Sequence, residues 1–297
     1  MKNTLILCVG MHRSGTSLTA GLLETLGCTL PGTKVAADNS NPTGYFENKD
    51  IVDKQEQLLT DLGFWWPTEQ ASYGLPRDIT HQLAYHSFIE WLTNYLQNTI
   101  AHHGNHLAIK DPRTSLLLPA WREAASRLEI QIKLLICVRE PRDVCRSLVV
   151  RDGPQAGMDW SRAQRLWLEH YLAILNGSEG LSFLVTQYES WLDRTQAKEQ
   201  LIKVASFIDL ECSTEKIATA LERIRPEFNH GGGNEFPRID RAVRRVHHAL
   251  RSNHQRKDLI QTANSSKKRL LRHQWRQSRL ERLRALASRA GKKQNCQ

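Results

Sequence analysis

The residues best suited to chemistry form a short glycine-rich segment near the N-terminus, Gly10-Met-His-Arg-Ser-Gly-Thr-Ser17. Its two glycines have the GxxxxG spacing of a phosphate-binding loop, in which the backbone wraps an anion and successive N–H groups point inward. A helix that starts directly after the loop would add the favourable end of its dipole. We therefore predict that the loop binds a phosphate-like group through Gly10, His12, Arg13, Ser14, Gly15, Thr16 and Ser17.

The loop differs from the ATP- and GTP-binding version of this motif. The position after Gly15 holds Thr16 instead of the usual lysine, and Arg13 is the only cation within the loop. Phosphoryl transfer also needs Mg²⁺ and a carboxylate that holds it, but the residues expected at two strand ends are Lys110 and Arg139. A sulfuryl group carries less charge than a phosphoryl group, so a cationic site without a metal suits its transfer.

Three segments together resemble the sulfotransferases that use 3′-phosphoadenosine 5′-phosphosulfate (PAPS). Arg13 to Ser17 is similar to the family's 5′-phosphosulfate loop, in the arginine-bearing version of the tyrosylprotein type and of many bacterial members. Val138 to Ser147 resembles the 3′-phosphate element, with an arginine at a strand end and a serine eight residues later. Lys110 to Arg113 resembles an element whose lysine contacts the transferring sulfate in some members. The resemblance spans roughly residues 4–210 and excludes the C-terminal segment.

The resemblance implies transfer of a sulfuryl group from PAPS to an acceptor hydroxyl or amine without a metal, leaving adenosine 3′,5′-bisphosphate. Arg13 and the loop amides would hold the 5′-phosphosulfate, and Lys110 would stabilise charge on the bridging oxygen. Arg139 and Ser147 would bind the 3′-phosphate. Tyr188 could pack near the nucleotide or be an ordinary half-buried tyrosine. The acceptor stays open among small molecules, lipids, peptide tyrosines and carbohydrates, with a carbohydrate hydroxyl slightly preferred.

Glu47 is the first candidate for the base that takes the acceptor's proton. It lies in Asn41-Pro-Thr-Gly-Tyr-Phe-Glu47-Asn48, downstream of the loop helix, much as the glutamate base follows that helix in the tyrosylprotein type. Nearby cations would normally lower the pKa of such a carboxylate, unless burial opposes them. The alternative is that Glu47 only orders its loop or caps a helix that begins near Asn48. His12 and Asp38 are the reserve candidates.

Two other functions remain open. A magnesium-dependent kinase acting on a small molecule or nucleoside would need a loop lysine and a metal-binding carboxylate. Asp111 is the carboxylate on offer, and it is flanked by Lys110 and Arg113. A binding protein would instead use its basic C-terminal segment to contact nucleic acid, an anionic membrane or an acidic polymer. Solvated charge on an extension is the commoner explanation for such a segment.

These residues need a sheet and helices to position them. Apolar runs at Leu5–Val9, Ile130–Val138 and Leu181–Val185 predict buried parallel strands. Helical spacing predicts helices at 15–26, 81–101, 115–128, 141–151, 161–176 and 196–208. The alternation predicts an α/β protein, a three-layer P-loop fold with a central parallel sheet flanked by helices. Residues 31–76 are expected to be irregular, with Trp65-Trp66 either a substrate platform or packing under a loop.

Charge is distributed unevenly along the chain. Residues 238–297 hold 18 Lys and Arg against three acidic residues, a net charge of +15, so residues 1–237 carry −5 of the overall +10. This shift, with the run Gly231–Gly233, predicts a sulfotransferase-like domain over 1–230 and a basic extension, largely helical or partly disordered, over 231–297. The six cysteines form no CxxC pair, which argues against a disulfide framework or a zinc site.

The N-terminus has only about five apolar residues before its first glycine, too few for a signal peptide. No run approaches the roughly 20 apolar residues that span a bilayer. We therefore expect a cytoplasmic protein, and the sequence leaves its oligomeric state open.

Overall fold

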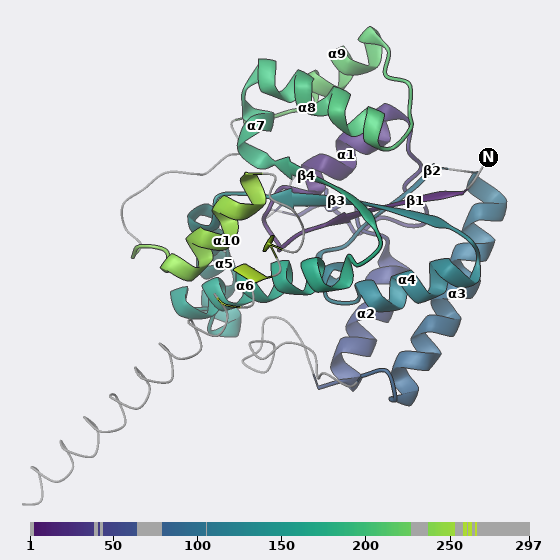
Figure 1. Cartoon of the computed structure of the whole chain (residues 1–297), viewed down its shortest axis with the longest axis horizontal. Coiled ribbons are helices and arrows are strands. Elements are labelled where there is room, and N and C mark those ends of the chain that lie inside the picture. Colours follow the sequence, from purple (N-terminus) through teal and green to yellow (C-terminus); the bar gives the residue numbers. More distant parts are fainter. Residues whose placement is uncertain are drawn as a thin grey trace, which may run out of the picture.

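A computed structural model of the chain describes residues 3–38, 41, 44–63, 79–104, 106–226, 237–252, 258–259, 261–262 and 265. In these residues, four parallel strands form one sheet in the spatial order β2-β1-β3-β4. The strands are β1 (Thr4–Val9), β2 (His106–Lys110), β3 (Gln131–Val138) and β4 (Ser182–Gln187). Helices lie on both faces of the sheet (Figure 1). The predicted α/β fold, a parallel sheet between layers of helices, is confirmed.

The two faces of β1 belong to different parts of the core. Leu5, Leu7 and Val9 are buried in one apolar cluster, and Ile6 and Cys8 are buried in another. Successive side chains of a strand point to opposite faces, so a continuous apolar run is what a strand covered on both sides requires. Helices over the first face are α3 (Leu83–His103), α4 (Leu118–Arg127) and α6 (Trp160–Gly177). Helices over the second are α1 (Thr16–Leu26), α8 (Arg194–Phe207) and α9 (Thr214–Glu222).

The predicted elements correspond to observed ones. The three predicted strands are β1, β3 and β4, and the six predicted helices are α1, α3, α4, α5 (Pro141–Ala156), α6 and α8. Helix α5 runs five residues past its predicted end at 151 and stops at Gly157, which adopts the left-handed conformation. Three short helices were not predicted: η2 (Pro112–Ser115), a 3-10 helix, α7 (Tyr188–Leu192) and α9.

The expectation that residues 31–76 are irregular is wrong for α2 (Lys49–Asp61). The Asn48 side chain caps this helix by accepting a hydrogen bond from the Ile51 N–H at 3.1 Å. Ile51, Leu58 and Leu59 recur at helical spacing and are buried. The segment that contains Trp65 and Trp66 lies outside the described residues.

All four strands end at the same edge of the sheet. The register pairs Cys8 of β1 with Lys110, the last residue of β2. Ligands of open α/β sheets bind outside the carboxyl ends of the strands. The segments that follow these ends are Gly10–Ser17 after β1, Asp111 after β2, Arg139 after β3 and Tyr188 after β4.

Part of the predicted C-terminal extension packs on this sheet. Helix α10 (Arg241–Arg251) buries Val243, Val246 and Leu250 against α5, α6, β3 and β4. The boundary at residue 230 stays a prediction, because the glycine run and residues 266–297 lie outside the described residues. None of the helices in the described part of the chain is long and apolar enough to cross a membrane.

Candidate active site

The glycine loop is pressed between β3 and Tyr188. A Cβ atom on Gly10 would lie 2.7 Å from the carbonyl oxygen of Cys137, and one on Gly15 would lie 2.5 Å from Cδ2 of Tyr188. Gly15 also has φ +87°, a left-handed conformation that favours glycine, and it forms the N-cap of α1. Glycine is therefore the residue that fits both positions without displacing Cys137 or Tyr188.

Two side chains that were not predicted brace the loop. Ser115 Oγ accepts a hydrogen bond from the Gly10 N–H at 3.0 Å and donates one to the Gly10 carbonyl at 3.1 Å. The Tyr171 hydroxyl donates to the Cys137 carbonyl at 2.7 Å and lies 3.2 Å from Ser14 Oγ. These contacts join η2 and α6 to the loop over more than a hundred residues of sequence. The sequence carries no signal for them beyond a serine and a tyrosine among apolar residues.

Four predicted donor-site residues meet beside the loop. Arg13 Nε donates a hydrogen bond to Ser147 Oγ at 2.9 Å. Arg139 Nη1 donates to the Arg13 carbonyl at 3.2 Å, and the Arg139 guanidinium lies 4.3 Å from the centre of the Tyr188 ring. Burial lowers the pKa of Arg13, and the positive charges of Arg151 and Arg139 lower it further. Cations concentrated in this way favour an anionic ligand.

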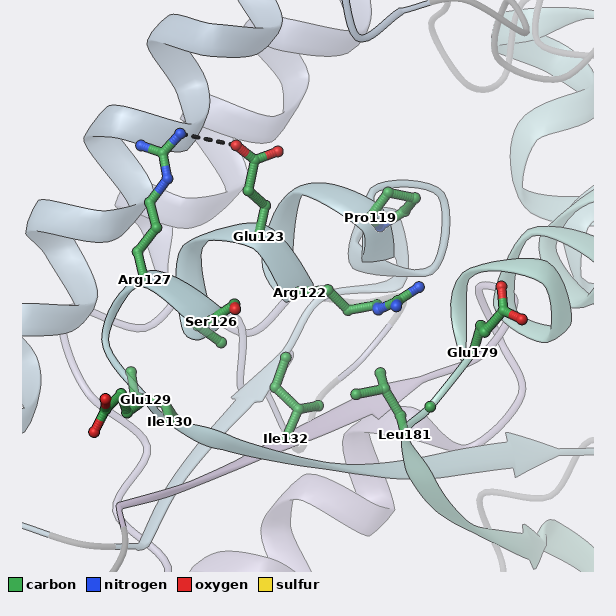
Figure 2. A pocket seen from close by; sticks show the side chains of 12 residues that line it. Pro119, Arg122, Glu123, Ser126, Arg127, Glu129, Ile130, Ile132, Glu179 and Leu181 are labelled. Carbon is green, nitrogen blue, oxygen red and sulfur yellow. Dashed lines mark hydrogen bonds and ion pairs between the residues drawn. The ribbon is translucent and has the colours of Figure 1, made fainter.

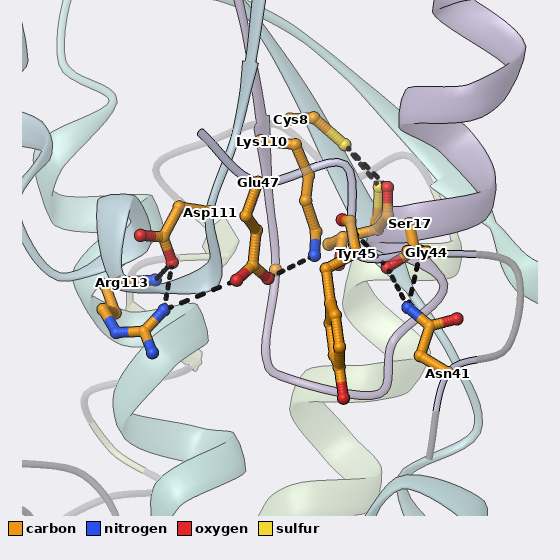
Figure 3. A network of polar contacts seen from close by, with 12 residues as sticks. Cys8, Ser17, Asn41, Gly44, Tyr45, Glu47, Lys110, Asp111 and Arg113 are labelled. Atoms are coloured by element: carbon orange, nitrogen blue, oxygen red, sulfur yellow. Dashed lines mark hydrogen bonds and ion pairs between the residues drawn. The ribbon is translucent and has the colours of Figure 1, made fainter. Parts of the chain in front are cut away.

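The remaining loop residues have mainly internal partners. Ser17 Oγ donates to the Tyr45 carbonyl at 3.3 Å and accepts from Asn41 Nδ2 at 3.2 Å (Figure 3). The His12 ring is buried and packs edge-on against His170, with ring centres 6.0 Å apart. Burial, with the charges of Arg113 and Arg151, holds the pKa of His12 well below 6.5, so this imidazole is neutral near pH 7.

Of the candidate bases, Glu47 is the one that lies against Lys110. Lys110 Nζ donates to Glu47 Oε1 at 2.5 Å, and the two side chains are 3% and 9% exposed (Figure 3). Burial raises the pKa of Glu47, although the charges of Lys110 and Arg113 act to lower it. Burial, with the negative charge of Asp111, outweighs these cations, so the pKa of Glu47 lies above its ordinary value, which suits a base. Asp38, in contrast, is exposed and accepts a hydrogen bond from the Tyr45 hydroxyl at 2.8 Å.

Further charged residues surround this pair. Arg113 Nη1 lies 2.8 Å from Asp111 Oδ1 and 3.8 Å from Glu47 Oε2, and its Nη2 lies 2.6 Å from Glu56 Oε1. Asp111 is completely buried, and its Oδ2 accepts a hydrogen bond from Gln55 Nε2 at 2.8 Å. Asp111, the carboxylate on offer for Mg²⁺ in the kinase alternative, therefore has protein donors on both of its oxygens.

A cavity of about 990 Å³ lies away from these residues (Figure 2). It is lined by Ile130 and Ile132 where β3 begins and by Leu181 just before β4, with charged α4 side chains such as Arg122 above them. This is the amino edge of the sheet, opposite to the glycine loop. The hollow is therefore not the place where the predicted site residues gather.

No protein family matches the chain, and no curated protein matches its sequence. Solved structures that resemble it include the sulfotransferase domain of the Synechococcus PCC 7002 olefin synthase (18% identity, TM-score 0.44, covering 89% of this chain and 95% of that chain). They also include the sulfotransferase domain of the curacin biosynthetic pathway (13%, 0.43, 89% and 97%). A third is the sulfotransferase STF9 of Mycobacterium avium (14%, 0.41, 74% and 67%). At these identities and TM-scores, the likeness assigns no activity to this chain.

Proposed function

We propose that the protein is a sulfotransferase that takes a sulfuryl group from PAPS and transfers it to an acceptor hydroxyl, with a carbohydrate hydroxyl as the first acceptor to test. The observation that carries this proposal is the junction of Arg13, Ser147 and Arg139 beside the glycine loop. It joins a site for one phosphate group to a site for a second one. PAPS has phosphates at both its 5′ and 3′ positions, whereas ATP has none at the 3′ position.

The residues present fit the two ends of this donor. The amino end of α1, with Thr16 and Ser17 in its first turn, offers backbone N–H groups to the 5′-phosphosulfate. Ser147 Oγ accepts from Arg13, which leaves its own hydroxyl proton to donate to a 3′-phosphate oxygen. Arg139, held by Tyr188 and by the Arg13 carbonyl, supplies the charge opposite that phosphate.

The Glu47–Lys110 pair supplies the groups for the transfer. PAPS provides a sulfuryl group that is activated by its link to the 5′-phosphate. Lys110 donates a hydrogen bond to the bridging oxygen, where negative charge develops as the bond from sulfur to that oxygen breaks. Glu47 accepts the proton of the acceptor hydroxyl while the new bond from that hydroxyl oxygen to sulfur forms. The mechanism that we propose is in-line and needs no metal.

Calorimetric titration tests the donor. We expect adenosine 3′,5′-bisphosphate to bind tightly without magnesium, ATP to bind weakly, and Arg139→Ala to lose the preference. Arg127→Ala serves as the matched control, because Arg127 pairs with Glu123 on the exposed side of α4. Binding of ATP alone, and only with magnesium, would overturn the proposal in favour of a kinase. A screen of acceptors with radiolabelled PAPS would then follow the donor test.

A further inference from the structure

Arg113 lies beside Glu47, at the carboxylate oxygen that does not contact Lys110. Its guanidinium comes from η2 and is in contact with three carboxylates, those of Glu47, Asp111 and Glu56. Figure 3 shows the contacts of the guanidinium with Asp111 and with Glu47. These contacts leave Glu47 with a cation on each of its oxygens, Lys110 at Oε1 and Arg113 at Oε2.

A network of hydrogen bonds fixes Arg113 in this place. Asp111 Oδ1 accepts from both the backbone N–H and Nη1 of Arg113, at 3.0 and 2.8 Å. Gln55 donates to the other oxygen of Asp111, and Gln55 Oε1 accepts from Thr114 Oγ1 at 3.1 Å and Trp121 Nε1 at 3.0 Å. The indole nitrogen can only donate, so the orientation of the Gln55 amide is determined. Each link therefore has a single direction, and the guanidinium cannot turn away from Glu47 without breaking several of them.

Donor binding would change the partners of Glu47. On the proposed function, Lys110 turns toward a 5′-phosphate oxygen, and the ion pair with Glu47 weakens. A buried carboxylate that loses its cation either takes up a proton or moves toward water. The charged groups that face Glu47 are Lys110 at the end of β2, Asp111 after it, and Arg113 in η2, with Glu56 of α2 on the far edge of the guanidinium. Arg113 then remains as the cation in contact with Glu47.

We propose that Arg113 is a positioning residue that keeps Glu47 ionised and in place while Lys110 is engaged by the donor. This inference rests on the proposed function. An arginine suits the role because its planar guanidinium presents Nη1 to both Asp111 and Glu47 and Nη2 to Glu56. A lysine ammonium is a single compact charge, so it cannot serve the three carboxylates from one fixed place.

The test counts protons that are taken up when adenosine 3′,5′-bisphosphate binds. This ligand carries the 5′-phosphate oxygen that Lys110 would contact, and no acceptor is needed. Titration calorimetry in buffers of different ionisation enthalpy, between about pH 5.5 and 8, gives the number of protons bound per ligand. We expect Arg113→Gln to take up more protons than the wild type, by a fraction of one proton. The excess should be largest between the pKa of Glu47 in the free variant and its higher pKa in the complex.

Two controls identify the group that titrates. In Glu47→Gln/Arg113→Gln the extra uptake should disappear, because no carboxylate remains to be protonated at position 47. Arg127→Gln, which removes an arginine from an exposed pair, should match the wild type. If Arg113→Gln does not fold, as judged by near-UV circular dichroism, Arg113→Lys takes its place and should also exceed the wild type. Wild-type uptake in the variant that folds would overturn the positioning role. Failure of the wild type to bind the bisphosphate would overturn the proposed function instead.

Discussion

Ser147 Oγ accepts a hydrogen bond at 2.9 Å from Nε of Arg13, a residue 134 positions earlier in the chain. The bond joins the glycine loop after β1 to the helix after β3. It sets the spacing between the two proposed phosphate sites before any ligand is bound. A donor with phosphates at that spacing gains affinity because the ordering has already occurred.

Ser147→Ala should weaken binding of adenosine 3′,5′-bisphosphate about 10- to 100-fold. One hydrogen bond to a charged group is worth about 1.5–3 kcal/mol, and 1.4 kcal/mol corresponds to a factor of ten. Calorimetry measures this change, and Ser190→Ala is the control because Ser190 Oγ binds only an exposed glutamine in the described contacts. Equal affinities in the two variants would remove Ser147 from the donor site.

Gly15→Ala should weaken donor binding as well as lower stability. The new methyl group would meet the Tyr188 ring and would sit at φ +87°. Gly180→Ala is the matched control, since Gly180 has φ +74° with no atom close to the added carbon. Gly180→Ala should lose about 1–2 kcal/mol of unfolding free energy in urea, and Gly15→Ala should lose more because its methyl group also meets the Tyr188 ring. Only Gly15→Ala should also bind the bisphosphate at least about tenfold more weakly, the cost of losing one charged hydrogen bond.

Removal of either member of the Glu47–Lys110 pair should destabilise the fold. Glu47→Gln leaves the buried Lys110 ammonium without its carboxylate, a loss of about 3–5 kcal/mol. Lys110→Met should cost less, because Arg113 still lies 3.8 Å from Glu47 Oε2. The double variant should lose less than the sum of the single losses, because no uncompensated charge remains between the two positions. Urea unfolding provides the comparison. Additive losses would mean that the two side chains do not interact in solution.

Sulfuryl transfer should decline on the acid side with a midpoint above pH 4.5, the ordinary value for glutamate. Burial raises the pKa of Glu47, and the base must be ionised to accept a proton, so activity is full above this pKa and falls as pH drops through it. His12→Asn should leave the midpoint unchanged, because the pKa of His12 is depressed well below 6.5. The measurement is kcat/KM against pH with an identified acceptor. A midpoint that shifts in His12→Asn would transfer the role of base to His12.

The sequence predicts the edge of the sheet well for a physical reason. Parallel strands in register end together, so residues that follow apolar runs must meet, and this places Lys110, Arg139 and Tyr188 beside the glycine loop. Helical spacing likewise locates α1, α3 and α6, whose apolar residues recur along one face. These inferences need only the spacing of apolar residues along the chain and the position of each candidate residue relative to them.

The surroundings of Glu47 could not be obtained in this way. Proline, glycine and asparagine on both sides of α2 favour an irregular segment there, so the hydrogen bond from Gln55 to Asp111 could not be predicted. The roles of Arg113 and Ser115 depend on the directions of side chains in a single 3-10 turn. Such directions follow from tertiary packing and have no counterpart in local sequence spacing.

The two hydrogen bonds between Ser115 and Gly10 affect the electrostatics of the loop. The Ser115 hydroxyl is hydrogen-bonded to both the N–H and the carbonyl of Gly10, so both backbone polar groups of this residue already have a protein partner. The carbonyl lone pairs, which would repel an arriving anion, are directed at a proton donor instead. The backbone groups that can attract an anion are therefore the N–H groups in the first turn of α1, and not those at the end of β1. An anion bound by the loop would be recognised by the N–H groups at the start of α1, and not by the backbone of Gly10.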